Sequence, residues 1–190
     1  MKPRTIMRMA LSVSILGTLT FICIILLCTE TVSIFVECYS VDSSGCLYVG
    51  KYGKICVYEG KSEIRTFSAK TDAGYHFTVT EQDTILLSSG SHVYEMDLQG
   101  NVISKQNDLS SEMYYKLRGY DRSFDAPDGN QYSLRGEWGW TRIIKNGEEV
   151  VYKISTLSFI VKILLYLIIV CFVAVFFWIL VDESNYRSKA

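Results

Sequence analysis

Hydrophobic residues gather at the two ends of this 190-residue chain, whereas apolar and polar residues alternate in the part between them. The C-terminal run from Ile163 to Val181 holds no charge, proline or glycine. As a helix it would match a hydrocarbon core roughly 30 Å thick, since each helical residue rises about 1.5 Å. The pattern predicts a transmembrane helix over 157–181, followed by a short tail at 182–190.

A second apolar run covers 9–28 and follows a basic segment, 1–8, which holds no acidic residue. A cleaved signal peptide has a core of roughly 7–15 residues and a small-residue exit, which this run does not match, although cleavage remains the alternative. We expect a retained helix with a cytoplasmic N-terminus, because basic residues flank the cytoplasmic side of membrane helices. Two spans would return the tail to the same side, as in a multi-pass protein of the plasma membrane.

The middle of the chain, 29–156, alternates with a period of two, and turn residues separate its short apolar runs. In His92–Leu98 the apolar residues alternate with acidic ones, which is typical of a half-buried strand. The strands group into units of about four, at a period near 40 residues, over 39–67, 75–104 and 114–154. We therefore expect a membrane protein in which two transmembrane α-helices flank an all-β antiparallel extracytoplasmic domain of blade-like repeats, or alternatively a β-sandwich or barrel.

One short sequence motif resembles the repeats of a known family. The stretch ValAspSerSerGlyCysLeuTyrValGly, residues 41–50, resembles the repeats of bacterial β-propellers of the NHL and PQQ-like kind, where Asp-x-x-Gly-x-x-Tyr-Val joins a turn to a strand. A similar Gly-x-x-Tyr recurs at Gly129–Tyr132. The resemblance implies a scaffold or binding surface and no single activity. Since propellers close with four to eight blades, three units imply either that several chains complete a ring or that the strands form another compact arrangement.

The cysteines do not describe a disulfide scaffold. Three of the six, Cys38, Cys46 and Cys56, lie in the middle of the chain, and an odd number leaves at least one unpaired within a monomer. In a tight hairpin around 52–53, alternation places Cys46 and Cys56 on opposite faces. A bridge between Cys38 and Cys46 stays open as a possibility.

Charge and motifs limit the function classes. Acidic residues outnumber basic ones between the apolar ends, which argues against nucleic acid as a partner. The sequence has no G-x-S-x-G, H-E-x-x-H, P-loop or C-x-x-C motif, and His76 and His92 lack metal-ligand spacing. Pro127-Asp128-Gly129 is typical of a turn and lacks the alternating acids of a calcium loop. We expect no enzyme activity, no catalytic residues, no metal and no cofactor.

A cluster of aromatic residues and arginines near the end of the middle region suits stacking on a sugar, a peptide or an anionic polymer. It also includes Tyr114, Tyr115, Arg118 and Arg122. The alternatives are an aromatic core, or tryptophans that rest on lipid headgroups. The candidate binding residues are Tyr120, Tyr132, Trp138, Trp140, Arg135 and Arg142.

A strip of small residues, Ala10, Ser14 and Thr18, recurs every four positions of the first apolar run beside Gly17. Such a strip predicts close helix packing, on the second helix or on another subunit. The alternative is that the two hydroxyl groups bond to the backbone of their own helix.

These patterns lead to one functional hypothesis and one alternative. We expect a non-enzymatic integral membrane protein whose extracytoplasmic β domain binds a partner or an envelope ligand. Its partners would be the lipid bilayer and either a second copy of the chain, in a homo-oligomer, or another membrane protein. The alternative is an accessory subunit of a membrane transport or secretion complex.

Overall fold

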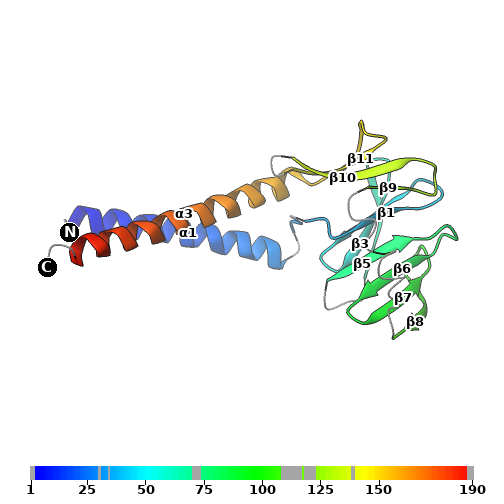
Figure 1. The fold of residues 1–190 in the computed structure, drawn as a ribbon, viewed down its shortest axis with the longest axis horizontal. Helices are drawn as coiled ribbons and strands as arrows, with labels where there is room; N and C mark the ends of the chain where they lie inside the picture. The colour runs from blue at the N-terminus through cyan, green and yellow to red at the C-terminus, as the bar shows by residue number, and fades with distance from the viewer. Residues whose placement is uncertain are drawn as a thin grey trace. The chain divides into compact units, whose positions relative to one another are not determined.

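The computed structural model describes residues 3–29, 31–33, 35–69, 74–107, 117, 123–137 and 140–187. The chain divides into two compact units. The helical unit combines residues 1–34 and 155–190, and the β unit comprises residues 35–154. Figure 1 shows the helices α1 and α3 of the first unit and the strands of the second.

The helical unit consists of α1 (Pro3–Cys28) and α3 (Thr156–Arg187). The two helices pack against each other along one stripe, with Cys23, Val161 and Ile168 buried between them. Most of the other described apolar side chains of both helices are exposed; Phe21, for example, keeps 63% of its surface accessible. Helices that are apolar all round and exposed are typical of a membrane environment.

The structure corrects the expectation of two membrane spans. Among the described residues, α3 alone is long and apolar enough to cross a membrane, over Thr156–Ala174. Over the residues of α1 whose side chains the structure describes, the apolar segment covers Val13–Cys28, which is shorter than the roughly 20 residues that a span requires. Because α1 begins at Pro3, its first turns also include the charged Arg4 and Arg8. A multi-pass topology is therefore not supported.

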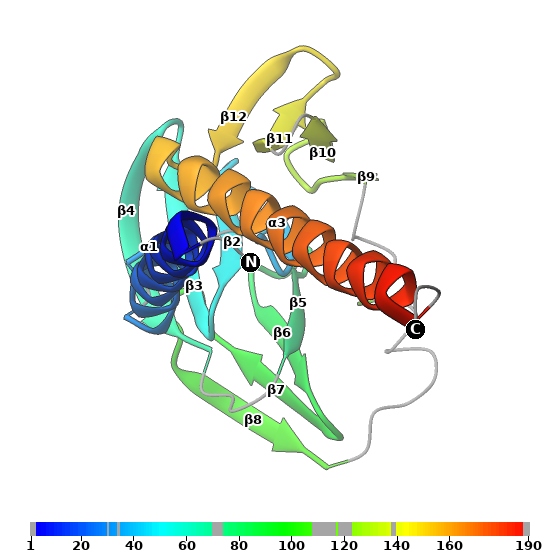
Figure 2. The ribbon, with the colours of Figure 1, turned by 90° about the vertical axis from the view of Figure 1, so that its left-hand side faces the viewer.

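The β unit contains three sheets, each a meander of four antiparallel strands in sequence order. The first sheet comprises β1 (Tyr39–Val41), β2 (Leu47–Lys51), β3 (Lys54–Glu59) and β4 (Ser62–Ser68). The second sheet, whose consecutive strands can be followed in Figure 2, comprises β5 (Tyr75–Val79), β6 (Ile85–Ser89), β7 (His92–Met96) and β8 (Val102–Gln106). The third sheet comprises β9 (Ser123–Asp125), β10 (Gln131–Glu137), β11 (Trp140–Lys145) and β12 (Glu149–Lys153).

The all-β content of the middle region is confirmed over 35–107 and 123–154, as far as the structure describes these residues. The expected architecture, a two-span protein with a propeller-like domain, is wrong, since the described strands form three separate sheets beside one helix of membrane length. The alternative of a single sandwich or barrel does not describe them either. The repeat of about four strands predicts the pairing within each sheet but leaves open how the sheets combine.

The first sheet lies between the other two, because both faces of its strands β1, β2 and β3 are buried, whereas β4 is exposed. Ile55 and Val57 of β3 belong to a core that the second sheet completes with Phe77 and Leu87. On the opposite face, the ring of Tyr58 meets that of Tyr152 from the third sheet at a centroid distance of 5.4 Å. Burial on both faces explains why β2 and β3 hold near-continuous apolar runs.

A tight turn at Tyr52-Gly53 sets the pairing of β2 with β3. Both residues have positive φ angles, 42° and 71°, which a two-residue hairpin turn requires. The resulting register pairs Val49 with Cys56. All six cysteines are free thiols, so the possible Cys38–Cys46 bridge is not formed.

Candidate ligand-binding site

The turn between the first two strands of each sheet has the same backbone pattern. Its first N–H donates to the carbonyl of its fifth residue, and its fourth N–H donates back to the carbonyl of the first, at 2.8–3.1 Å. The fourth residue has a positive φ in each case: Gly45, Asp83 and Gly129. We call these segments the first turn (42–46), the second turn (80–84) and the third turn (126–130).

The three turns meet at one end of the β unit. Ser43 donates two hydrogen bonds to the carboxylate of Asp83, from its N–H at 3.1 Å and from its hydroxyl at 2.6 Å. On the other side, a Cβ atom at Gly45 would lie 3.5 Å from Oδ2 of Asp128. The first turn therefore contacts the second and the third.

Asp42 holds the first turn together from inside. Its Oδ1 accepts hydrogen bonds from the N–H groups of Ser44 and Cys46 at 3.0 and 2.8 Å, and its Oδ2 accepts one from the hydroxyl of Tyr48 at 3.2 Å. Asp42 is only 3% exposed. Burial, followed by the charge and hydrogen bond of Asp42, raises the pKa of Tyr48 well above its usual value. The Asp-x-x-Gly-x-x-Tyr motif therefore stabilises the first turn.

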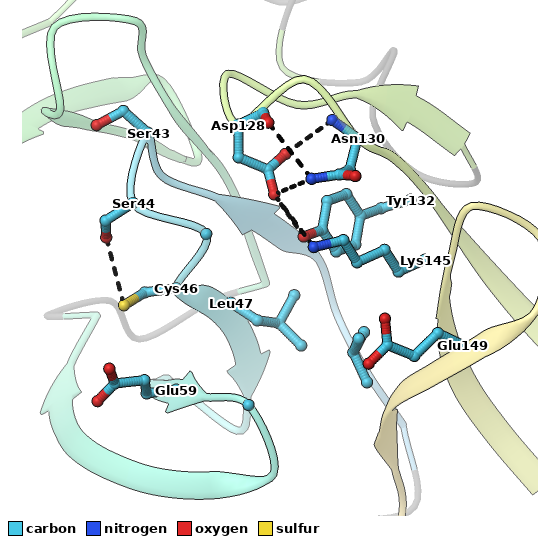
Figure 3. A pocket seen from close by; sticks show the side chains of 13 residues that line it. Ser43, Ser44, Cys46, Leu47, Glu59, Asp128, Asn130, Tyr132, Lys145 and Glu149 are labelled. Carbon is cyan, nitrogen blue, oxygen red and sulfur yellow. Dashed lines mark hydrogen bonds and ion pairs between the residues drawn. The ribbon is translucent and has the colours of Figure 1, made fainter.

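A cavity of about 480 Å³ opens between the first turn and the third sheet. We call it the turn pocket. Its wall comes from the first turn, from the β3–β4 hairpin at Glu59 and Gly60, and from the third sheet. Figure 3 shows the side chains that the third sheet contributes: Asp128, Asn130, Tyr132, Lys145 and Glu149.

Asp128 is the centre of a fixed hydrogen-bond network in this wall. Its Oδ2 accepts from the Tyr132 hydroxyl at 2.8 Å and from Nδ2 of Asn130 at 2.7 Å, and it lies 3.7 Å from Nζ of Lys145. Burial raises the pKa of the Asp128 carboxyl, but these hydrogen bonds and the Lys145 charge outweigh it, so the pKa lies below its usual value. Burial and Asp128 raise the pKa of Tyr132. At neutral pH the pair is a carboxylate and a neutral phenol.

The other acidic groups of the turn pocket, Glu59 and Glu149, are exposed to solvent. Together with Asp128 they outnumber the single ammonium group of Lys145. Within the described part of the chain, the acidic, histidine and cysteine side chains form no group that could hold a metal ion. The wall offers acceptors and donors side by side, held by two different sheets.

The structure divides the predicted aromatic and arginine cluster. Tyr120 and Trp138 lie outside the described residues, as do Tyr114, Tyr115, Arg118 and Arg122. Tyr132 is 2% exposed and lies in the turn pocket. Arg135 and Arg142 lie directly opposite each other on β10 and β11, and Trp140 lies two residues before Arg142 on the same strand. Because side chains alternate along a strand, Tyr132 points to the face opposite to the other three.

The small residues of α1 that the structure describes are exposed. Ser14 and Thr18 face away from α3, and the Thr18 hydroxyl donates to the carbonyl of Ser14 at 2.9 Å. The side chain of Ala10 lies outside the described residues. Packing of this strip on another subunit stays a prediction.

Sequence reasoning missed Glu59, Lys145 and Glu149 as pocket residues. The signal was present in the turns at Glu59-Gly60-Lys61 and Asn146-Gly147-Glu148, which recur late in the first and third units. Only the packing of the third sheet on the first brings the two turns to one cavity.

The comparisons with known proteins define no class for this fold and site. No family model matches the sequence, and no curated protein matches it. Among solved structures, a protein of unknown function from Bacteroides caccae is similar to this chain, with 12% sequence identity and a TM-score of 0.33. The match covers 63% of this chain and 45% of that one, so this chain spans less than half of the length of its structural neighbour.

Proposed function

We propose that this protein is a membrane-attached binding protein whose β unit recognises a saccharide in the turn pocket. The observation that carries the proposal is the fixed network around Asp128, which sets donors and acceptors in place before a ligand arrives. A preorganised wall avoids part of the ordering cost of binding.

The chemistry of the wall favours hydroxyl groups as ligands. Carboxylates at Glu59 and Glu149 accept hydrogen bonds, whereas the ammonium of Lys145 donates them. A hydroxyl group both donates and accepts, so a sugar can use both kinds of partner. The cavity volume falls in the range of small-ligand sites, roughly 300–1,000 Å³, and the polar lining suits a hydrophilic occupant.

We propose binding without turnover. A general acid needs a proton at working pH, and the hydrogen bonds to Asp128 hold the pKa of its carboxyl low. Lys145 also forms an ion pair with this carboxylate. These side chains are arranged to keep the wall rigid and charged.

The membrane attachment rests on α3, whose Thr156–Ala174 segment is long and apolar enough to cross a bilayer. The tail after this segment holds Arg187 and Lys189, and basic residues favour the cytoplasmic side. We propose that the β unit lies on the outer side of the plasma membrane. The role of an accessory subunit in a transport complex stays a prediction, which co-purification of a stoichiometric partner in mild detergent would support.

The saccharide proposal is tested with the full-length protein in mild detergent on an array of immobilised oligosaccharides. Wild-type protein should bind a defined subset of glycans, and Glu149→Gln should weaken that binding by at least fivefold. Glu148→Gln is the matched control, because it removes the neighbouring exposed charge without touching the pocket. No glycan bound by the wild type, or equal binding by both variants and wild type, would contradict the proposal.

A further inference from the structure

Three cationic side chains form a row across the third sheet. Arg135 of β10 lies directly opposite Arg142 of β11, and Arg142 lies directly opposite Lys153 of β12. Directly opposite residues have Cβ atoms about 5 Å apart and share one face of the sheet. We call these three residues the cationic row. Like charges placed opposite each other destabilise a sheet. The cationic row therefore lowers the stability of the third sheet, and a role in folding does not account for it.

A β-bulge in β12 creates this row. The register shifts between Ile143 and Ile144, so that Ile144 pairs with Val150 and Ile143 with Tyr152. One residue of β12, Val151, is therefore extra. With a regular register Lys153 would pair with Thr141, which lies on the other face. The bulge places Lys153 beside Arg142.

The cationic row lies on the face of the third sheet that points away from the first sheet. Ile143 and Tyr152, the next pair in register, are buried, and Tyr152 contacts Tyr58 of the first sheet. Because side chains alternate, the row points the opposite way. Arg135 and Lys153 are exposed, whereas Arg142 is half-buried. Within the part of the chain that the structure describes, none of the three forms an ion pair with a carboxylate.

An indole ring extends the row. Trp140 lies on the same face as Arg142, and Nζ of Lys153 lies 3.9 Å from the centre of its ring. Tryptophan is enriched where a protein meets lipid headgroups, because its ring is apolar at one end and has an N–H donor at the other.

The covalent chain ties this face to the membrane helix. β12 ends at Lys153 and α3 begins at Thr156, so their Cα atoms are at most about 11 Å apart. Anionic headgroups carry the phosphate groups that arginine and lysine bind. They are also the anions that a helix entering a bilayer meets first.

We propose that the cationic row, with Trp140, binds the phosphate groups of anionic lipids in the membrane that α3 enters. The proposal uses the membrane attachment of α3 and is independent of the saccharide site. Each basic residue near an anionic surface raises affinity by about fivefold, so three raise it by roughly 100-fold, and salt weakens the effect.

The test is native mass spectrometry of the full-length protein in mild detergent with phosphatidylglycerol or phosphatidylcholine. Wild type should retain phosphatidylglycerol in preference to phosphatidylcholine, and the Arg135→Gln, Arg142→Gln, Lys153→Gln triple variant should lose that preference. A matched control changes three exposed lysines of the other sheets to Gln: Lys54, Lys61 and Lys105. The control should keep the preference.

Thermal melts separate binding from folding. The triple variant should melt close to wild type, because it removes like-charge repulsion together with the favourable contact of Lys153 with Trp140. Should it fail to fold, Arg135→Gln alone should reduce phosphatidylglycerol retention by about fivefold. Equal retention of both lipids by wild type, or unchanged preference in the folded variant, overturns the proposal. Displacement of the lipid by inorganic phosphate at equal concentration would show a general phosphate site and overturn the assignment to lipid.

Discussion

Nζ of Lys145, at the end of β11, lies 3.7 Å from Oδ2 of Asp128, and this ion pair joins β11 to the third turn. The Tyr132 hydroxyl donates to the same oxygen. A single carboxylate therefore orders the wall of the turn pocket. Protonation of this carboxylate would weaken its hydrogen bond with Tyr132 and its ion pair with Lys145.

Acid should loosen this wall. The pKa of Asp128 is lower in the folded protein than its ordinary value of 3.8, so its contribution to stability is fully present above that value and is lost as pH falls through the folded pKa. Thermal melts from pH 7 to pH 2 should therefore fall less for Asp128→Asn than for wild type below about pH 4. Asp125→Asn, an exposed neighbour, should follow wild type. Parallel curves for wild type and Asp128→Asn would refute the linkage.

The buried carboxylate of Asp42 should matter more than its less buried counterpart at Asp97. Asp42→Ala leaves the buried Tyr48 hydroxyl and the half-buried Cys46 N–H without an acceptor, and a fully buried donor left this way costs roughly 1–3 kcal/mol. Asp97 accepts the same kind of turn hydrogen bonds but faces water, which can replace it. In denaturant titrations Asp42→Ala should lose several times more stability than Asp97→Ala. Equal losses would show that burial of the first turn is unimportant.

Gly100 should tolerate no side chain. Its φ is +88°, and a Cβ atom would lie 2.3 Å from the ring of Phe67, which packs on it from the first sheet. Gly100→Ala should lower stability by about 2–4 kcal/mol, from backbone strain and overpacking together. Gly90→Ala, at φ +60° with open space around it, isolates the backbone cost and should lose about 1 kcal/mol. Similar melts for the two variants would contradict the close contact of Phe67.

The β unit should fold without the helices. Residues 35–154 form a compact unit with a core of their own, which includes Ile55, Phe77 and Leu87. A fragment of these residues should show a β-type circular dichroism spectrum and a cooperative melt. An uncooperative melt would mean that the helical unit supplies part of the fold.

The sequence predicts the strands better than their assembly. Alternation in segments such as His92–Leu98 and glycine at turns are local signals, and the sheets occur at 39–68, 75–106 and 123–153. The burial of the first sheet on both faces is a tertiary property that no local period reveals. The expectation of a second span was wrong as well, because the apolar segment of α1, over its described residues, is shorter than a span requires.

The candidate sites show the same limit. Proximity in sequence grouped Tyr132 with Arg135, yet strand alternation places them on opposite faces of β10. Lys153 was not in the predicted cluster, because a bulge in β12 brings it opposite Arg142 and a bulge is not visible in the alternation. The turn pocket is formed by two sheets. No local sequence motif could therefore group its residues from β3 and β12.

Each sheet pairs only strands that follow one another along the chain. Such local pairing closes short loops and favours rapid folding. During synthesis the first and second sheets can therefore assemble around their shared core before the third is made. The turn pocket and the cationic row both depend on the third sheet, which is synthesised last of the three, immediately before α3. A stalled or shortened chain that ends after β8 would keep the core shared by the first two sheets and lose both proposed binding surfaces.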